Sequence, residues 1–469
     1  MMKSHGWKHT AVLLFLAATA IVSPAQTFTA IHSFNGNGAS PFAGLVLATD
    51  GNLYGTTTAG GAYFAGTVFK ITPTGRLTTI YSFCPNKYDC SDGLLPDGKL
   101  VQATDGNLYG TTLHGGPDEW GTIFKITPEG TLTTLHTFDY SDGGFPNAGL
   151  MQATDGNLYG SSSGAGTYNW GTIFRMNLDG TLATLYNFCS QMNCSDGSEP
   201  QAALLQAKEG NLYGTTTRGG AHGSGTIFKI SLGGTLTTLY SFCAQTNCTD
   251  GAYPYTGLVQ SNDGSLYGTT GQGGAYNNGT VFKISPTGTL TTLYEFCAQT
   301  NCADGSFPYG LVLATDGNLY GTTGGGGIHG DGTLFRITLS GTLRTLSFDG
   351  NDGEEPIANL MQATNGNFYG TTYSGGAYNQ GTVFQLSIGL APFVETLPIS
   401  GKVGAIVDIL GTNLTGATSV SFNGTAATFT VVSASEITTT VPSGATTGIL
   451  TVTTPSGTLN SNVVFRVRQ

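Results

Sequence analysis

Short segments in which apolar and polar residues alternate cover most of the chain, and Gly-rich turns separate them. The segments "DGNLYGTT", "GTVFKI" and "TLTTLYSF" recur in this order, and an apolar stretch such as "GLVLAT" precedes each set. Alternation with a period of two between turn signals is typical of β-strands. Each set therefore predicts a unit of four strands.

The tyrosine of "DGNLYGTT" counts the units, because it recurs about every 50 residues, the period of a propeller blade. Its seven positions are Tyr54, Tyr109, Tyr159, Tyr213, Tyr267, Tyr320 and Tyr369. Four-stranded units that stack around an axis bury both faces of each sheet. We therefore expect an all-β fold with a seven-bladed β-propeller over residues 26–390. In the fourth strand, Leu236, Tyr240 and Phe242 should lie on one face of the sheet and Leu239 on the other.

The Asp-Gly that opens "DGNLYGTT" predicts a turn. Asp-Gly or Asn-Gly between two apolar segments favours the positive φ angles of a two-residue hairpin. A catalytic or binding arrangement is expected once in a chain, whereas this motif occurs in every unit. The motif is therefore interpreted as a hairpin turn and a strand.

The last unit has no copy of "TLTTLYSF" after its segment "GTVFQLSIG". The missing segment occurs at the other end of the repeats, where residues 27–34 read "TFTAIHSF". An N-terminal strand that completes the last blade would close the ring and remove its open edges. The pattern favours a closed ring, and an open array of repeats is the alternative.

Composition and charge describe a folded, acidic chain. Of its 469 residues, 39% are hydrophobic and 10% are charged, which is enough apolar material for more than one domain. The formal net charge of -11 argues against nucleic acid and anionic membranes as partners.

Residues 1–25 have the features of a secretory signal peptide. Two lysines precede an apolar segment at residues 11–22, and small residues follow it up to a predicted cleavage site after Ala25. An uncleaved membrane anchor is the alternative, but the segment is shorter than the roughly 20 residues that span a bilayer. We expect a protein without membrane insertion that is secreted, extracellular or periplasmic, either free or associated with the cell surface.

The eight cysteines occur as four pairs that are close in sequence. In the corresponding segments after Phe34, Phe138 and Phe348, both cysteines are missing together. In an oxidising compartment this pattern predicts four disulfides. Zinc binding is the alternative, but no histidine lies near any pair. The predicted disulfides join Cys84 to Cys90, Cys189 to Cys194, Cys243 to Cys248, and Cys297 to Cys302.

The ordered motifs of the units resemble the GloVer repeat of the choice-of-anchor tandem repeat proteins. "DGNLYGTT", a Gly-rich loop, "GTVFKI" and "GTLTTLYSF" follow one another in this way between residues 27 and 390. The resemblance implies an exported bacterial protein, and it implies no particular biochemical role.

The composition changes at Ala391, where cysteine and the tyrosine repeat disappear. Residues 391–469 resemble an IPT/TIG domain, which implies an immunoglobulin-like β-sandwich that serves mostly as a spacer or docking module. The residues that carry this resemblance are Gly411, Asn413, Leu414, Val420, Phe422, Gly424, Val441, Pro442, Gly444 and Ala445.

Two sets of long, variable loops share one face of the predicted propeller, and this face is the expected binding surface. One set, which follows "DGNLYGTT", carries aromatic residues or histidine beside Asn and Asp. Such groups suit the C–H faces and hydroxyls of sugars; alternatively, the tyrosines pack on the Gly-Gly loops. The candidate binding residues are Tyr63, Trp120, Tyr168, Trp170, His222, Tyr276, His329 and Tyr378.

These features favour a non-catalytic binding or scaffold protein whose partner is a polysaccharide or an extracellular protein. The alternative is a carbohydrate-active lyase or hydrolase. No metal ion or other cofactor is expected, and calcium at the "DGxxP" turns is the alternative that their single carboxylate supports weakly. The loop residues that could support catalysis are His114, His222 and His329, with Asp118 and Asp331 as carboxylate partners.

Overall fold

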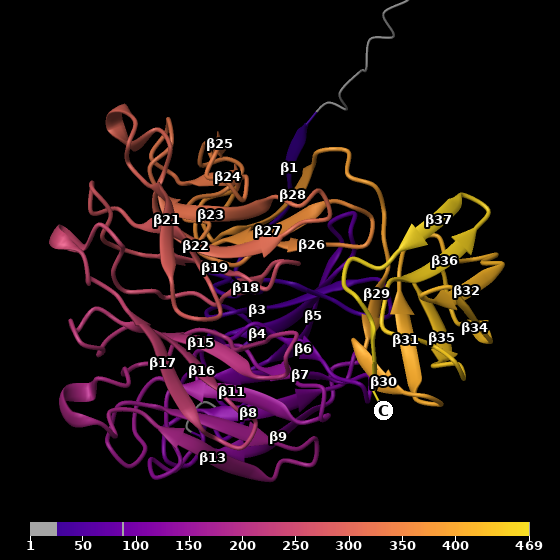
Figure 1. The fold of residues 1–469 in the computed structure, drawn as a ribbon, viewed down its shortest axis with the longest axis horizontal. Helices are drawn as coiled ribbons and strands as arrows, with labels where there is room; N and C mark the ends of the chain where they lie inside the picture. Colours follow the sequence, from indigo (N-terminus) through magenta and orange to yellow (C-terminus); the bar gives the residue numbers. More distant parts are fainter. Residues whose placement is uncertain (1–25, 87–88, 469) are drawn as a thin grey trace, which may run out of the picture.

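The computed structural model describes residues 26–86 and 89–468, and it shows an all-β protein (Figure 1). The predicted signal peptide, residues 1–25, lies outside the described residues. Three short 3₁₀ turns accompany the strands: η1 (Met192–Cys194), η2 (Thr246–Cys248) and η3 (Thr300–Cys302).

Within the described residues, the repeat region contains seven four-stranded antiparallel sheets, here numbered 1 to 7 along the chain. Sheet 1 consists of β2 (Val46–Leu47), β3 (Leu53–Thr57), β4 (Thr67–Ile71) and β5 (Leu77–Ser82). Sheet 2 consists of β6 (Val101–Gln102), β7 (Leu108–Thr112), β8 (Thr122–Ile126) and β9 (Leu132–Thr137). Sheet 3 consists of β10 (Met151–Gln152), β11 (Leu158–Ser162), β12 (Thr172–Met176) and β13 (Leu182–Asn187).

The next three sheets repeat this order of strands. Sheet 4 consists of β14 (Leu205–Gln206), β15 (Leu212–Thr216), β16 (Thr226–Ile230) and β17 (Leu236–Ser241). Sheet 5 consists of β18 (Val259–Gln260), β19 (Leu266–Thr270), β20 (Thr280–Ile284) and β21 (Leu290–Glu295). Sheet 6 consists of β22 (Ser306–Leu313), β23 (Leu319–Gly325), β24 (Thr333–Ile337) and β25 (Leu343–Ser347).

Sheet 7 combines the two ends of the repeat region. Its strands are β26 (Met361–Gln362), β27 (Phe368–Thr372), β28 (Thr382–Ser387) and the N-terminal β1 (Thr27–Ser33). The strand β1 pairs antiparallel with β28, with Thr29 opposite Gln385. The N-terminal segment therefore takes the place that "TLTTLYSF" takes in the other sheets.

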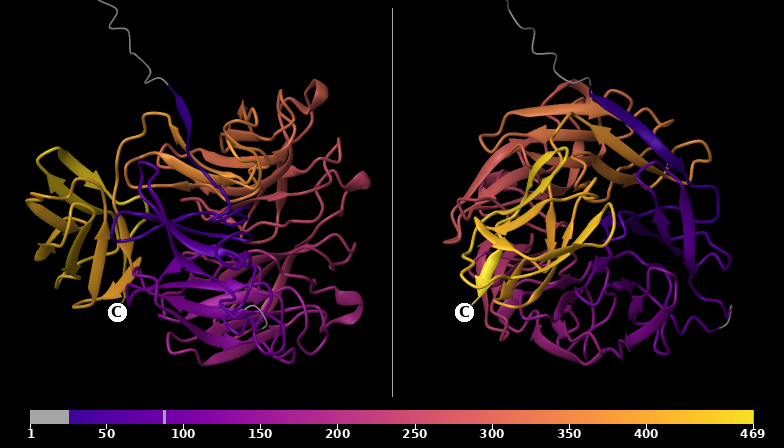
Figure 2. Two further views of the ribbon diagram at one scale, coloured as in Figure 1. Left: turned by 180° about the vertical axis from the view of Figure 1, so that it is seen from behind. Right: turned by 90° about the vertical axis from the view of Figure 1, so that its right-hand side faces the viewer.

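Each sheet uses both faces, as its sequence pattern requires. In sheet 1, Leu53 and Phe69 pack against Tyr369 of sheet 7, whereas Tyr54 and Val68 pack against sheet 2. The same arrangement joins every sheet to the next one. The sheets stand around a common axis in the right-hand view of Figure 2, as propeller blades do.

The fourth strand differs from the expected alternation of faces. In sheet 4, Ile227 pairs with Tyr240 and Phe228 with Thr238, so Leu239 is the extra residue of a β-bulge. An extra residue shifts the alternation by one position. Leu239 therefore packs with Tyr240 and Phe242 against sheet 5, whereas Leu236 packs on the other face. The prediction that placed Leu236 with Tyr240 and Phe242 is wrong for this reason.

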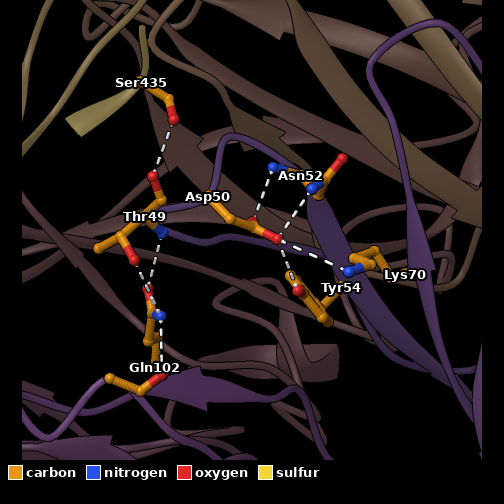
Figure 3. Close-up of polar contacts among 8 residues, drawn as sticks. Thr49, Asp50, Asn52, Tyr54, Lys70, Gln102 and Ser435 are labelled. Atoms are coloured by element: carbon orange, nitrogen blue, oxygen red, sulfur yellow. Dashed lines mark hydrogen bonds and ion pairs between the residues drawn. The ribbon is translucent and has the colours of Figure 1, made fainter. Parts of the chain in front are cut away.

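The turn in "DGNLYGTT" is not the expected two-residue hairpin. Of residues 48–52, which form this turn in sheet 1, Gly51 alone has a positive φ, +78°, and it donates its N–H to the carbonyl of Ala48. The longer turn leaves the Asp50 carboxylate free to accept hydrogen bonds from Asn52 N and, at 2.8 Å, from the Tyr54 hydroxyl (Figure 3). The aspartate thus fixes the turn and satisfies a buried tyrosine.

Glutamine side chains join neighbouring sheets beside these turns. Gln102 Oε1 accepts the backbone N–H of Thr49 in sheet 1 at 2.9 Å (Figure 3), and its Nε2 donates to Gly106 O of its own turn. Gln152, Gln206, Gln260 and Gln362 make the same pair of bonds. In sheets 1 and 6 the position is held by Leu47 and Leu313, so two of the junctions between sheets lack this connection.

The four predicted disulfides are present, Cys84–Cys90, Cys189–Cys194, Cys243–Cys248 and Cys297–Cys302. They close loops that follow the fourth strand and lead to the next sheet. Beside the disulfides, aspartates of the "DGxxP" turns accept hydrogen bonds from groups in the same loop and in the strand before it. Asp250, for example, is fully buried and accepts the Tyr240 hydroxyl at 2.8 Å and Ala244 N at 2.9 Å.

The C-terminal domain, residues 394–468, is an immunoglobulin-like sandwich. One sheet consists of β29 (Glu395–Leu397), β31 (Ile406–Leu410), β35 (Glu436–Thr440) and β34 (Phe429–Val431). The other consists of β33 (Thr425–Ala427), β32 (Ser419–Phe422), β36 (Leu450–Thr454) and β37 (Gly457–Asn460). A parallel pair is formed by β30 (Ser400–Lys402) and β38 (Arg466–Arg468). The core of the C-terminal domain includes Ile409, Phe422, Ile437 and Val452.

This domain lies on the face of the repeat region that carries the short "TDGN" turns (Figures 1 and 2). Ser435 Oγ donates to Thr49 O of sheet 1 at 2.8 Å (Figure 3), and Thr412 shares a 3.2 Å hydrogen bond with Thr364 of sheet 7. Across the axis, Arg466 Nη1 donates to Ala207 O of sheet 4 at 3.3 Å. The domain therefore spans the axis, and the long loops lie on the opposite face.

Candidate functional site

A recurring loop points one residue of every repeat toward the axis. In sheet 2, Leu95 N donates to Ala65 O of the preceding sheet, and Pro96 packs beside Gly66, where a Cβ would meet the proline ring at 2.6 Å. Gly66 has a φ of +97°, which glycine adopts readily. The glycine therefore makes room for the proline, and the proline fixes the direction of the residue that follows it.

The residues after these prolines line one cavity on the axis, here called the axial cavity, with a volume of about 270 Å³. Every sheet contributes one such residue, and the set combines apolar, aromatic, amide and carboxylate side chains. In order from sheet 1 to sheet 7 they are Phe42, Asp97, Asn147, Gln201, Tyr255, Tyr309 and Ile357.

A second layer of residues lies two positions further along each chain segment. Lys99 lies in this layer and lines the axial cavity. The equivalent positions in the two neighbouring sheets are Gly44 and Gly149, whereas sheet 7 has Asn359 there. Because the two glycines bring no side chain, the lysine has space to extend within the cavity.

On the long-loop face the axial cavity opens into a wider mouth of about 560 Å³. Rings stand around it: Phe42 is 40% exposed and Phe307 is 45% exposed, and Tyr309 and Tyr373 line the same space. The carboxylate residue Glu355 also lines the mouth. The mouth thus combines exposed aromatic surface with hydrogen-bonding groups.

The two charged residues of the axial cavity have perturbed pKa values. Burial raises the pKa of Asp97 from its ordinary 3.8 to about 7. Burial lowers the pKa of Lys99, and the carboxylate of Glu395 in the C-terminal domain opposes this effect. Within the described residues, neither Asp97 nor Lys99 forms an ion pair within 4.0 Å. The amide oxygen of Asn147 is buried and has no hydrogen-bond partner.

The loop residues predicted to bind lie away from this cavity. Tyr63, Tyr168, Tyr276 and Tyr378 are exposed on the loops between the second and third strands, as are His222 and His329. Tyr63 lies near Tyr81 of the fourth strand, whose pKa is raised first by burial and in small part by Tyr63. None of these residues lines the axial cavity or its mouth, so the structure does not bring them together there.

The two candidate tryptophans have different surroundings. Trp120 packs against Tyr140 and Phe145, with 4.9 Å between ring centroids in both pairs. Trp170 is 42% exposed, and its carbonyl accepts the backbone N–H of Glu199 from the next sheet. Both tryptophans therefore belong to junctions between neighbouring sheets.

The histidines considered for catalysis are also dispersed. The ring of His114 packs on Phe145, with 5.2 Å between centroids, and His222 and His329 lie on exposed loops of different sheets. Residues 26–86 and 89–468 contain no group of three or more His, Cys, Asp or Glu side chains placed to hold a metal ion.

Sequence reasoning missed Asp97, Lys99 and the other residues of the axial cavity. The signal was present, since the "DGxxP" frame is nearly constant while the residue after its proline changes from unit to unit. A variable position in a constant frame is where a repeat protein can differ in ligand contacts. Only the structure shows that the residue after the proline points toward the axis.

Family models match most of the chain. The model described as Gloeobacter/Verrucomicrobia repeat matches residues 19–154, 96–304 and 297–426, and the IPT/TIG domain model matches residues 393–467. No curated protein matches this sequence.

Comparison with solved structures finds matches at low sequence identity. A fungal alcohol oxidase of the AA5 family, in complex with copper, is 12% identical with a TM-score of 0.52, and the match covers 94% of this chain and 99% of that chain. A Bacteroides uniformis protein assigned only provisionally as a 6-phosphogluconolactonase is 18% identical with a TM-score of 0.45, covering 68% of this chain and 88% of that one.

The likeness to the oxidase concerns the fold alone. The ordered repeat motifs, the four-stranded sheets that they form and the extent of the family match agree with one another. The chain therefore belongs to the Gloeobacter/Verrucomicrobia repeat family and carries a C-terminal IPT/TIG domain.

Proposed function

We propose that this protein is an extracellular, non-catalytic binding protein that recognises a glycan at the mouth of the axial cavity. The observation that carries the proposal is the group of exposed aromatic rings around this mouth, with Phe42 and Phe307 above the polar residues of the cavity. Sugars offer apolar C–H faces bordered by hydroxyls, and such surfaces pair with rings and nearby hydrogen-bonding groups.

The proposal includes a closed, seven-bladed propeller as the scaffold. Sheet 7 packs on sheet 1 through Met361 and Leu45, and Thr371 Oγ1 donates to Ala43 O at 3.1 Å. The pairing of β1 with β28 supports the same arrangement, because it joins the two ends of the repeat region in one sheet. A rigid ring would hold the mouth residues of all the sheets at fixed distances.

The disulfides support an extracytoplasmic location. Short-range disulfides persist in oxidising compartments and are rare in the cytosol, and four of them are present here. The described part of the chain has no helix with the length and apolar character to cross a membrane. In the proposed protein, the IPT/TIG domain serves as a spacer or docking module on the face opposite the glycan.

A polysaccharide panel, measured for binding and for new reducing ends or unsaturated products, tests this proposal. We expect binding without products, and loss of binding in Phe42→Ala and Phe307→Ala because each removes exposed ring surface at the mouth. Phe64→Ala is the matched control, since Phe64 is 81% exposed and does not line the mouth. Absence of binding to every polysaccharide, or equal loss in the Phe64 variant, would contradict the proposal.

A carbohydrate-active enzyme is the second candidate, and one observation favours it. Asp97 and Glu355 line the same mouth, and the pKa of Asp97, raised to about 7 by burial, suits a general acid. This candidate predicts that products accumulate with the wild-type protein and disappear with Asp97→Asn. Product release that depends on His222 or His329 instead would indicate that catalysis takes place at the loops.

A further inference from the structure

We propose that the axial cavity is a subsite for one neutral sugar residue at the end of a glycan chain, with Asp97 and Lys99 as its polar anchors. This inference rests on the proposed glycan-binding function and specifies which part of the glycan is recognised. It follows from the shape of the cavity, from the chemistry of its walls and from the lack of protein partners for its charged groups.

The axial cavity is open to a chain from one face only. Its mouth is on the long-loop face, and the IPT/TIG domain covers the other end of the axis (Figure 2). Hydrogen bonds from Ser435 to Thr49 and from Arg466 to Ala207 hold this domain on sheets 1 and 4. The domain therefore stands in the path of a polysaccharide that would thread through the ring, which favours entry of a chain end from the mouth.

The volume limits the ligand to about one ring. The axial cavity measures about 270 Å³, whereas pockets for drug-sized molecules measure roughly 300–1,000 Å³. A single pyranose fits this space, and further sugar residues would lie in the wider mouth beside Phe42 and Phe307.

The polar groups of the axial cavity match hydroxyls. Lys99 can only donate hydrogen bonds, the ionised Asp97 carboxylate and Asn147 Oδ1 accept them, and a sugar hydroxyl does both. Ile357 and the ring of Tyr309 provide apolar wall beside these groups. One cation near two carboxylates, Asp97 and Glu395, gives an acidic sugar no electrostatic advantage.

Asp97 and Lys99 form no ion pair within 4.0 Å in the described residues, and the Glu395 carboxylate acts on Lys99 only from a greater distance. Asp97 and Lys99 are partly exposed to the cavity, and charged groups without protein partners are retained where they serve a ligand. In the described residues, neither Asp97 nor Lys99 donates or accepts a side-chain hydrogen bond that meets a 3.5 Å limit. Both are therefore available to a molecule that enters the cavity.

The test uses methyl glycosides of neutral hexoses as single-sugar probes and the complete mature chain. Saturation-transfer NMR and calorimetry should detect their binding to the wild-type protein. Asp97→Ala and Lys99→Met should each weaken binding at least about tenfold, because each removes a charge-assisted hydrogen bond. Glu129→Gln and Lys229→Met are matched controls outside the cavity and should bind as the wild type does.

The outcomes separate this inference from the proposed function. If polysaccharides bind but methyl glycosides do not, or if the cavity variants bind chain ends normally, the subsite is wrong and the glycan-binding function stands. If no glycan binds at all, the result contradicts the proposed function, on which this inference rests. Cleaving a bound polysaccharide into shorter chains creates chain ends, so the same mass should compete more strongly with methyl glycoside binding. Equal competition before and after cleavage would contradict recognition of chain ends. Asp97→Asn, which keeps the side-chain shape, covers the case in which Asp97→Ala does not fold.

Discussion

At the scale of single residues, the protein uses carboxylates in two different ways. Asp250 is buried in a loop and its oxygens accept hydrogen bonds from Tyr240, Ala244 and Gln245. Asp97 is half-buried on the axis without such partners, and its desolvation there raises the pKa of its carboxyl to about 7. Saturated hydrogen bonding marks the first as structural, whereas its absence makes the second a candidate for ligand contact.

Asp97 should make the stability of the fold depend on pH. Its pKa is about 7 in the folded protein and 3.8 as an ordinary value, so between these values the folded state binds more protons than the unfolded state. Stability should therefore fall as pH rises from about 4 to about 7 and change no further from this group above that range. Lys99, Glu355 and Tyr309 are titratable side chains that face the same space as Asp97.

Urea unfolding at several pH values, compared between the wild type and Asp97→Asn, isolates this contribution. The variant should lose the part of the pH dependence that Asp97 supplies. Identical pH profiles for the two proteins would show that Asp97 titrates normally.

Replacement of Asp250 should destabilise the protein more than replacement of its tyrosine partner. Asp250→Ala leaves two backbone N–H groups and a hydroxyl without their acceptor, at a cost of about 2–4 kcal/mol. Tyr240→Phe removes one of these bonds and should cost about 1 kcal/mol. Urea unfolding of both variants measures the difference, and equal effects would contradict the assigned role of Asp250.

At the scale of the strands and their junctions, glutamines connect neighbouring sheets where backbone pairing is absent. Gln206 Oε1 accepts Thr154 N at 2.9 Å and its Nε2 donates to Gly210 O at 3.0 Å. Each of these bonds satisfies a backbone group of a turn that faces the IPT/TIG domain. The glutamine thus fixes the turn and the spacing between two sheets together.

Gln206→Leu should therefore lower the free energy of unfolding by about 1–3 kcal/mol, because two backbone groups lose their partners. Leucine is a fair replacement because the equivalent residues Leu47 and Leu313 show that it fits the position. Gln385→Leu on β28 is the control and should change stability little. Chemical denaturation of the wild type and the two variants measures these free energies of unfolding. An unchanged free energy in Gln206→Leu would mean that water satisfies the two backbone groups equally well.

The sequence predicted the strands well and their details less well. Periodicity located the four strands of each unit, since the strands of a blade are short and bounded by turn residues. It could not place Leu239, because a β-bulge depends on how two strands pair and leaves no local mark. The candidate site was harder still, because the approach of Asp97 and Tyr309 to one axis depends on the assembly of all the sheets.

At the scale of the whole molecule, the two ends of the repeat region meet in one sheet, and a separate domain covers the axis. β1 pairs with β28, and the IPT/TIG domain contacts both sheet 7 and sheet 1 through Thr412 and Ser435. The junction between these sheets lacks a glutamine, since Leu47 holds the position. The domain therefore bridges a junction that this side chain does not connect.

A disulfide between Thr29→Cys and Gln385→Cys tests the pairing of the chain ends, because these residues are opposite each other in the sheet. We expect an intramolecular bond in a monomer and a higher unfolding temperature than that of the reduced protein. The pair Lys283→Cys with Thr291→Cys, opposite each other within sheet 5, is the control. Bonds that form only between molecules would indicate an open or swapped arrangement.

We infer above that a glycan binds on the axis of the long-loop face. Hydrogen–deuterium exchange with and without a polysaccharide selected from the panel tests it most directly. We expect protection of peptides that span residues 41–44, 95–99 and 307–310, which line the axial cavity and its mouth. Protection confined to the loop tips at residues 61–66, 167–171 and 376–380 would contradict this inference.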